Sequence, residues 1–168
     1  MRAIVVFESL WGNTEQIARA VAVGLESVAD VEVVSADSAP TQLEAYDLVV
    51  VGGPTHAFSM SRPSTRQTAV QTQNAPRVVD RGIREWLHDV TAVFHPITAV
   101  TFDTKVESPR LPGSAAKAAS HDLRARGFDV SVPSETFRVH GYEGPLVDGE
   151  LARAEQWGRT LASSVVAH

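Results

Sequence analysis

A short stretch near the amino terminus combines a turn and side chains that suit the binding of a phosphate monoester. Residues 4–7 form a continuous apolar run, which is typical of a parallel strand covered on both faces. The run leads into the turn 9–14, SLWGNT, in which Gly12 lets the backbone approach a ligand. The side chains in this turn that can donate hydrogen bonds are Ser9, Asn13 and Thr14. A helix beginning near Asn13 would point its free amides and the positive end of its dipole at the turn, so the stretch predicts an anion site.

The same residues are compatible with an ordinary helix cap. Asn13 would then be the cap residue, and Gln16, three positions later, would close a capping box. Both interpretations remain open on the turn alone.

Composition limits the kind of protein that can carry this turn. A chain of 168 residues with 43% hydrophobic residues predicts a single domain, residues 1–168, with one sizeable core. A net charge of -5 argues against nucleic acid or an anionic membrane as the main partner. The absence of cysteine excludes thiol catalysis, thiolate metal sites, iron–sulfur clusters and disulfides.

Two further sequence features bear on location and metals. The first apolar run begins almost at Met1, without a basic and apolar leader, and no apolar run approaches membrane-spanning length, so we expect a cytoplasmic protein. The six histidines show no HExxH spacing, so no metal site is predicted.

Short apolar runs alternate with helical stretches along the whole chain. Strands are predicted at residues 3–7, 31–35, 48–52, 97–102 and 128–139, the last one broken at Pro133. This alternation predicts an α/β fold with a doubly wound, five-stranded parallel sheet of order 2-1-3-4-5 and helices on both faces, in three α/β/α layers.

The helices of this fold have recognisable starts and buried faces. The predicted starts are Asn13, a capping Asp80, Pro112 and Asp148, with a further short helix at residues 63–71. Trp86 and Trp157 each fall on an apolar stripe, so both are interpreted as core residues.

The strand order brings three loops together at the carboxyl edge of the sheet, where such folds bind ligands. These loops follow Phe7, Gly52 and Phe102. The second loop, residues 52–80, is far longer than the roughly 2 to 6 residues usual between a strand and its helix. We interpret it as a ligand-covering segment followed by a mobile or partner-facing one.

Two of these loops resemble those of a known family. Val5, Val6, Phe7, Ser9, Gly12, Thr14 and Ala18 match the amino-terminal signature of flavodoxins, and residues 51–58, VGGPTHAF, resemble their second flavin-binding loop. The resemblance implies a flavodoxin-like fold and a tightly but non-covalently bound FMN, whose phosphate lies in the first loop. Under it, the cofactor-binding residues are Ser9, Leu10, Trp11, Gly12, Asn13, Thr14, Pro54, Thr55, His56, Ala57, Phe58, Phe102, Asp103 and Thr104. No residue would be catalytic, because the cofactor carries the redox chemistry.

The chain departs from the flavodoxin pattern at several positions. Trp11 stands where many flavodoxins carry a threonine, so one hydroxyl donor is missing from the first loop. Residues 57–59 contain no glycine, although many flavodoxins have one in this loop. The third loop has no tyrosine to stack on the flavin ring, so Phe102, Phe58 or Trp11 would take the place of that tyrosine. Tyr142 is interpreted as a surface aromatic.

His56 is the one histidine in a loop where chemistry is expected. It could donate a hydrogen bond to a flavin carbonyl or help to protonate the reduced ring, or it could be a loop histidine satisfied by backbone groups.

The resemblance implies an FMN-binding electron-transfer protein that shuttles electrons from an NAD(P)H-dependent reductase to an acceptor enzyme. The alternative is an FMN-dependent NAD(P)H:quinone oxidoreductase or a related dehydrogenase on the same fold. That enzyme would use the long second loop as a lid, and His56, Arg62 or Tyr142 for its substrate. A third interpretation is a binding module of this fold that has lost its flavin.

Overall fold

A parallel sheet forms the centre of the molecule in a computed structural model that describes residues 1–166. Its strands are β1 (Arg2–Phe7), β2 (Asp30–Ser35), β3 (Leu48–His56), β5 (Thr98–Val106) and β6 (Glu135–Val139). They lie in the order β2-β1-β3-β5-β6, and every neighbouring pair is parallel. A two-residue strand, β4 (Ser59–Met60), pairs antiparallel with the end of β3. The predicted doubly wound order is therefore confirmed, with β4 as an addition.

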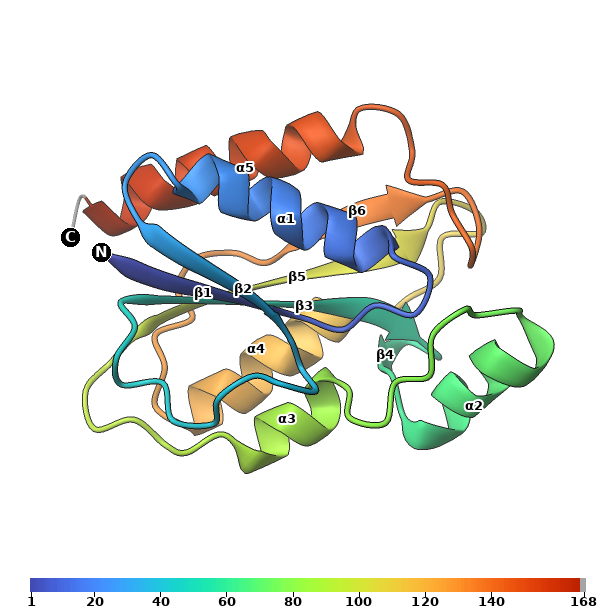
Figure 1. The fold of residues 1–168 in the computed structure, drawn as a ribbon, viewed down its shortest axis with the longest axis horizontal. Helices are drawn as coiled ribbons and strands as arrows, with labels where there is room; N and C mark the ends of the chain where they lie inside the picture. The colour runs from blue at the N-terminus through green and yellow to red at the C-terminus, as the bar shows by residue number, and fades with distance from the viewer. Residues whose placement is uncertain (167–168) are drawn as a thin grey trace.

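Five helices complete the described part of the chain. They are α1 (Asn13–Leu25), α2 (Pro63–Thr72), α3 (Ile83–Asp89), α4 (Ala115–Ala125) and α5 (Glu150–Val166). Figure 1 shows α1 and α5 on one face of the sheet and α3 and α4 on the other, which gives the three expected layers. Helix α2 stands apart at the carboxyl edge of the sheet, next to β4 (Figure 1). None of the helices within residues 1–166 is long and apolar enough to cross a bilayer.

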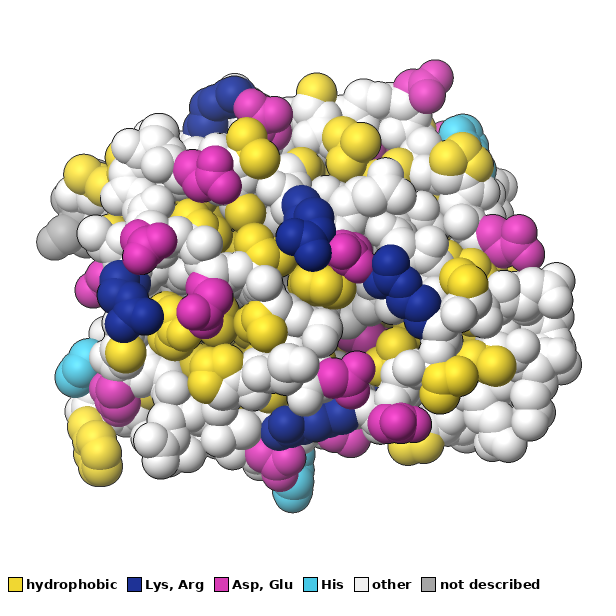
Figure 2. Space-filling model, viewed as in Figure 1, with side chains coloured by type: hydrophobic (Ala, Val, Ile, Leu, Met, Phe, Trp, Pro, Cys, Tyr) yellow, Lys and Arg dark blue, Asp and Glu magenta, His cyan; other side chains and the backbone are white. Residues whose placement is uncertain are grey.

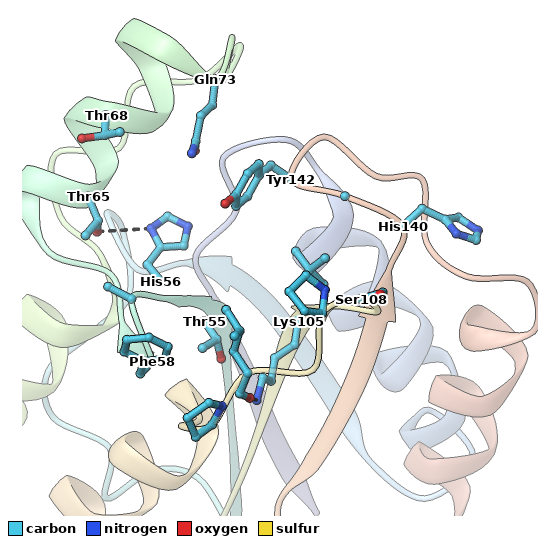
Figure 3. Close-up of a pocket in the computed structure, with 16 residues that line it drawn as sticks. Thr55, His56, Phe58, Thr65, Thr68, Gln73, Lys105, Ser108, His140 and Tyr142 are labelled. Atoms are coloured by element: carbon cyan, nitrogen blue, oxygen red, sulfur yellow. Dashed lines mark hydrogen bonds between the residues drawn. The ribbon is translucent and has the colours of Figure 1, made fainter.

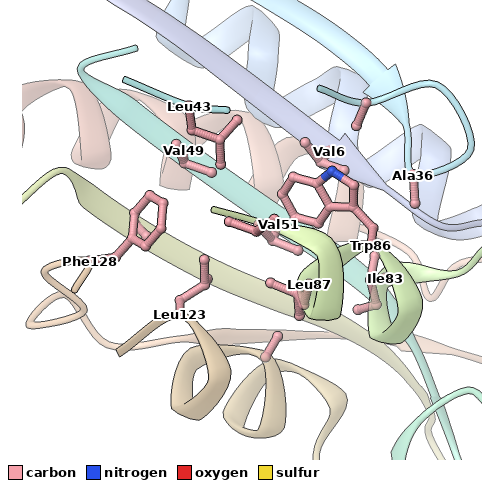
Figure 4. Packing of buried hydrophobic residues seen from close by; sticks show 14 of the residues in the cluster. Val6, Ala36, Leu43, Val49, Val51, Ile83, Trp86, Leu87, Leu123 and Phe128 are labelled. Carbon is pink, nitrogen blue, oxygen red and sulfur yellow. The ribbon is translucent and has the colours of Figure 1, made fainter. Parts of the chain in front are cut away.

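Each face of the sheet has its own apolar core. Beneath α3 and α4, Trp86 is fully buried among aliphatic side chains such as Val51 and Leu87 (Figure 4), and its indole Nε1 donates to Pro40 O at 3.0 Å. On the opposite face, Trp157 packs edge-on against Phe102, with ring centroids 6.2 Å apart. Trp86 is therefore a core residue, as predicted, whereas Trp157 is partly buried and packs against the core.

Helices α1 and α5 approach each other closely through two glycines. A Cβ atom added to Gly24 would lie 2.2 Å from Glu155 O, and one added to Gly158 would lie 2.3 Å from Val21 O. Neither distance is possible for a real Cβ, so the contact between these helices depends on the absence of both side chains.

Several predicted element ends were wrong. Strands β3 and β5 each run four residues further than predicted, because their pairing continues as far as Pro54 and Thr104 and β4 extends the ladder on β3. Helix α3 is capped by Gly82 and not by Asp80. Helix α4 begins after Ser114, whose hydroxyl accepts from Lys117 N at 3.2 Å. Helix α5 begins two residues after Asp148.

The long segment after β3 is held down by one buried cation. It contains α2, at the position predicted for a short helix, and Arg66 of α2 is only 3% exposed. The Arg66 guanidinium donates to Ser61 Oγ at 2.9 Å and to Val79 O at 3.0 Å, and it pairs with Glu85. These contacts fix α2 against the sheet edge, so the segment whose second part was expected to be mobile or partner-facing is anchored at Arg66.

Acidic and basic side chains are interspersed on one face of the molecule (Figure 2). On the face in Figure 2 they lie side by side, without a field of one sign. Ion pairs between different segments include Arg77–Glu15 at 2.6 Å and Arg81–Asp89 at 2.9 Å.

Candidate functional site

The turn between β1 and α1 has the geometry of an anion-binding loop. Gly12 is the residue before the helix and has a φ of 100°, a left-handed conformation that favours glycine. The first intrahelical bond runs from Gln16 N to Gly12 O at 3.1 Å, so the amides of residues 13–15 have no partner within the helix. Gly12 N donates to Ser9 Oγ at 3.0 Å, which closes the turn. The free amides and the helix dipole therefore point at the space in front of α1.

The capping interpretation of Asn13 was wrong. The cap position belongs to Gly12, and Asn13 is the first residue of the helix. Its amide Nδ2 donates to Glu143 O at 3.2 Å, so the side chain links the loop to the turn that follows β6. A Cβ on Gly144 would lie 2.5 Å from Asn13 Oδ1, so only a glycine allows this approach.

Two adjacent cavities lie at the carboxyl edge of the sheet. The smaller one, of about 40 Å³, lies in front of the first loop. The larger one, of about 610 Å³, opens between α2, the end of β5 and the turn after β6 (Figure 3). Thr55, His56, Val106 and Tyr142 line both cavities, so the two are neighbouring compartments of one site.

Most of the residues predicted from the sequence line these cavities. The smaller cavity is lined by Ser9, Leu10, Trp11, Asn13, Thr14, Pro54, Thr55, His56 and Thr104, and the larger one adds Ala57 and Phe58. Gly12 shapes the loop through its backbone. Thr14 and Thr104 meet inside the site, with their hydroxyl oxygens 2.8 Å apart, which joins the helix start to the end of β5.

Phe102 and Asp103 lie outside both cavities. The Phe102 side chain is fully buried on the α1/α5 side of the sheet, where Gly52 leaves room for its ring. Asp103 is also fully buried, and its Oδ2 accepts from Thr55 Oγ1 at 3.0 Å, Ser114 Oγ at 2.6 Å and Ala116 N at 3.1 Å. Its carboxylate thus holds the start of α4 against β5, and neither side chain is in position to contact a ligand in the site.

The sequence placed Tyr142 at a site only in the oxidoreductase alternative and otherwise predicted a surface aromatic. Its ring stacks on Trp11, with centroids 6.3 Å apart and planes 28° apart, although 60% of the residue remains exposed. Tyr142 lies in the turn after β6, which reaches the same edge of the sheet as the other loops. The rule that parallel strands end together could have identified this turn as a fourth site loop. Lys105 and Thr65 were missed, and both line the larger cavity.

The tip of β3 adopts an uncommon backbone conformation. Ala57 and Phe58 form the two-residue turn between β3 and β4, with φ values of 45° and 74°. A two-residue hairpin turn of this hand needs positive φ at both positions, and glycine or asparagine usually supplies it. Two ordinary side chains here cost about 1–2 kcal/mol each. The turn projects Phe58, which is 54% exposed, at the mouth of the larger cavity.

His56 is neutral in this environment. Burial and the nearby Arg66 guanidinium lower the pKa of His56 from 6.5 to about 4. Its Nδ1 lies 3.2 Å from Thr65 Oγ1 of α2, and its ring meets Trp11 edge-on with centroids 6.4 Å apart. The imidazole therefore stands at the junction of the two cavities, held from α2.

A buried carboxylate next to the first loop connects this loop to the segments that contain α2 and α3. Glu8, one residue before the loop, is 1% exposed, and it accepts from Ile83 N at 2.9 Å and from Ser61 Oγ. Burial raises the pKa of Glu8. Since Ser61 also accepts from Arg66, this network connects the loop, α2 and α3 in one rigid assembly.

The residues at the site fit an FMN. The smaller cavity has about three times the volume that one water molecule needs, which is the scale of a phosphate group, and free amides face it. Within residues 1–166, the buried indole Nε1 of Trp11 has no hydrogen-bond partner, and Trp11 is one of the residues that line this cavity. The larger cavity lies within the range of about 300–1,000 Å³ that is usual for ligand sites.

Comparison with known proteins shows what the sequence and the fold are similar to. The sequence model of the flavodoxin family matches residues 5–72, and flavodoxins are FMN-binding proteins. A search of curated protein sequences finds no match.

Solved structures with this fold include several flavodoxins. A flavodoxin from the domain Archaea is 22% identical, with 99% of both chains covered and a TM-score of 0.66. Oxidised flavodoxin 1 from Bacillus cereus is 20% identical, with 100% of this chain and 99% of the other covered and a TM-score of 0.67. The flavodiiron core of Flv1 from Synechocystis sp. PCC6803 is 18% identical, with 99% of this chain but 36% of the other covered and a TM-score of 0.64. The chain therefore has the flavodoxin fold over its length and the flavodoxin sequence pattern in residues 5–72.

Proposed function

We propose that the chain binds FMN and transfers electrons between redox partner proteins. The observation that carries this proposal is the phosphate-sized cavity facing the free amides of α1, directly beside a cavity of about 610 Å³. When bound, FMN would supply the chemistry by accepting and releasing electrons. The residues of the chain would bind and orient it and exclude water from part of it.

The phosphate would lie in the first loop. The amides of residues 13–15 and the hydroxyls of Ser9 and Thr14 would donate to it. The hydroxyl pair between Thr14 and Thr104 needs only one of its two protons, so one O–H remains free to donate to a ligand. Trp11 Nε1 supports the same role, because it supplies a donor at the position where many flavodoxins have a hydroxyl.

The ring would lie in the larger cavity, which has both polar and apolar side chains in its lining. Thr65 and Thr68 of α2 line one side (Figure 3), and the segment after β5 contributes Pro109, Leu111 and Pro112 to the lining. A ring with one polar and one apolar edge suits such a cavity. Partners would be an NAD(P)H-dependent reductase and an acceptor enzyme.

The test compares FMN with riboflavin, which lacks the phosphate. Thr14→Val removes the hydroxyl and keeps the shape, and it should weaken FMN binding about 10- to 100-fold, the effect of losing a hydrogen bond to a charged group. Riboflavin affinity should change much less. Thr160→Val, on the exposed face of α5, is the matched control. Binding would be measured by quenching of flavin fluorescence, and equal losses for both flavins would contradict the assigned phosphate site.

The size of the larger cavity also favours a second candidate, an FMN-dependent NAD(P)H:quinone oxidoreductase. Helix α2 forms one wall of this cavity and leaves it open, so a second planar molecule could enter. Turnover of NADPH with a quinone by the FMN-loaded protein, without an added reductase, would support the enzyme. Reduction only in the presence of a separate reductase would support the electron carrier.

A further inference from the structure

The hydrogen bonds around Thr65 determine which nitrogen of His56 carries the proton. Thr65 Oγ1 accepts from Arg62 N at 2.8 Å and donates to Arg62 O at 3.0 Å, and it lies 3.2 Å from His56 Nδ1. The hydroxyl has a single proton. If it donates to Arg62 O, all three contacts are satisfied only when His56 Nδ1–H donates to Thr65. If it donated to His56 instead, the contact with Arg62 O would be lost.

A neutral imidazole protonated at Nδ1 has an unprotonated Nε2. That nitrogen can only accept a hydrogen bond. No partner for Nε2 exists within residues 1–166, and the ring projects from β3 into the space between α2 and Tyr142 (Figure 3). The charged or titratable side chains that line this cavity with it are Lys105, His140 and Tyr142, and Arg66 lies close behind it. The site therefore has a directed, uncharged acceptor at the junction of its two cavities.

The complementary group on a ligand is an N–H donor. We propose that His56 Nε2 accepts a hydrogen bond from a ring N–H of the bound flavin and favours the reduced ring, and that Thr65 is the positioning residue that fixes the required tautomer. The inference rests on the proposed binding of FMN. The oxidised ring offers one N–H and several acceptors along its polar edge, whereas the reduced ring has gained protons on nitrogen. An acceptor therefore stabilises the reduced ring more. This reverses the roles expected from the sequence, in which His56 donated to a carbonyl or supplied a proton.

The ligand-free protein provides the first test, independent of FMN. Nitrogen-15 NMR of the imidazole at neutral pH should show a proton on Nδ1 and an unprotonated Nε2. A proton on Nε2 would overturn the proposal. Thr65→Val should abolish the preference between the two tautomers, and Thr65→Ser, which retains the hydroxyl, should restore it. Thr72→Val is the matched control, because it removes an exposed hydroxyl from the same helix without contact to His56.

The second test measures the affinities of oxidised and reduced FMN. In Thr65→Val, the preference for reduced over oxidised FMN should fall about 2-fold relative to wild type, because equal tautomer populations leave an accepting Nε2 on only about half of the molecules. Thr72→Val should leave this ratio unchanged. An unchanged ratio in Thr65→Val, with the tautomer altered, would overturn the proposal. Failure of wild-type protein to bind FMN would instead contradict the proposed function. The tautomer of His56 measured by NMR on the ligand-free protein would not be affected by that failure.

Discussion

Acidification should destabilise the fold through His56. Its pKa is about 4 in the folded protein and 6.5 in the unfolded chain, because burial and Arg66 oppose the charged imidazolium. Between these values the unfolded state binds more protons than the folded state. The free energy of unfolding must then fall as the pH falls from 6.5 to 4. A difference of 2.5 pH units, at about 1.4 kcal/mol for each, gives a full loss of about 3.5 kcal/mol, of which about 3 kcal/mol is reached at pH 4, where half of the folded molecules still carry a neutral His56.

The variant His56→Asn isolates this contribution. Asparagine keeps a short N–H donor near Thr65 but does not titrate. Free energies of unfolding would be measured with urea at several pH values between 7 and 4. The difference between wild type and His56→Asn should change by up to about 3 kcal/mol over this range in favour of the variant. His121→Asn, which replaces an exposed histidine of α4, is the control.

Two results would refute the reasoning. One is a difference between wild type and His56→Asn that does not depend on pH. The other is an NMR titration of the His56 ring protons with a midpoint near 6.5, since that would show an imidazole that is freely solvated.

Three further substitutions test the packing that holds the site, each by urea unfolding. Gly158→Ala should lower the free energy of unfolding by about 1–3 kcal/mol, because the new Cβ would lie 2.3 Å from Val21 O and this clash exceeds the gain in helix propensity. The control Ser163→Ala, at an exposed position of the same helix, should not lower it. Ala57→Gly should raise stability by about 1 kcal/mol, since φ at this position is 45°, and an unchanged or lower value would contradict the strained turn. Arg66→Met should cost about 3 kcal/mol by removing a buried, paired cation, and a neutral effect would show that α2 is held by other contacts.

The strand order and layers were predictable because buried parallel strands leave a strong apolar signal. The ends of the strands were not. Residues 52–56, GGPTH, have the composition of a loop, yet they continue β3 because β5 and β4 pair with them. Pairing between segments far apart in sequence can override local preference. This is also why the tip of β3 accepts positive φ at Ala57 and Phe58 without a glycine.

In the candidate site, too, some residues could be predicted from the sequence and others could not. Residues within one motif, such as Ser9, Asn13 and Thr14, were found because their chemistry is local. Phe102 and Asp103 were assigned to the site because they lie at a predicted strand end. Alternation along β5 points Phe102 toward a core, and the Asp103 carboxylate is hydrogen-bonded to Ser114 and Ala116 at the start of α4. A strand end identifies where a site lies, but it does not determine which of its side chains face it.

The role of His56 could not be read from the sequence for a further reason. Whether His56 Nδ1 donates or accepts depends on where its partner, Thr65, directs its hydroxyl proton. In the first turn of α2, Thr65 donates that proton to Arg62 O and accepts from Arg62 N. The start of this helix in turn has its place because Arg66 anchors it to Ser61 and Glu85. The hydrogen-bonding character of the site is thus set by a helix that lies outside the sheet and its covering layers. A chain with the same first loop and the same PTH sequence, but without α2, would have no fixed tautomer at this position.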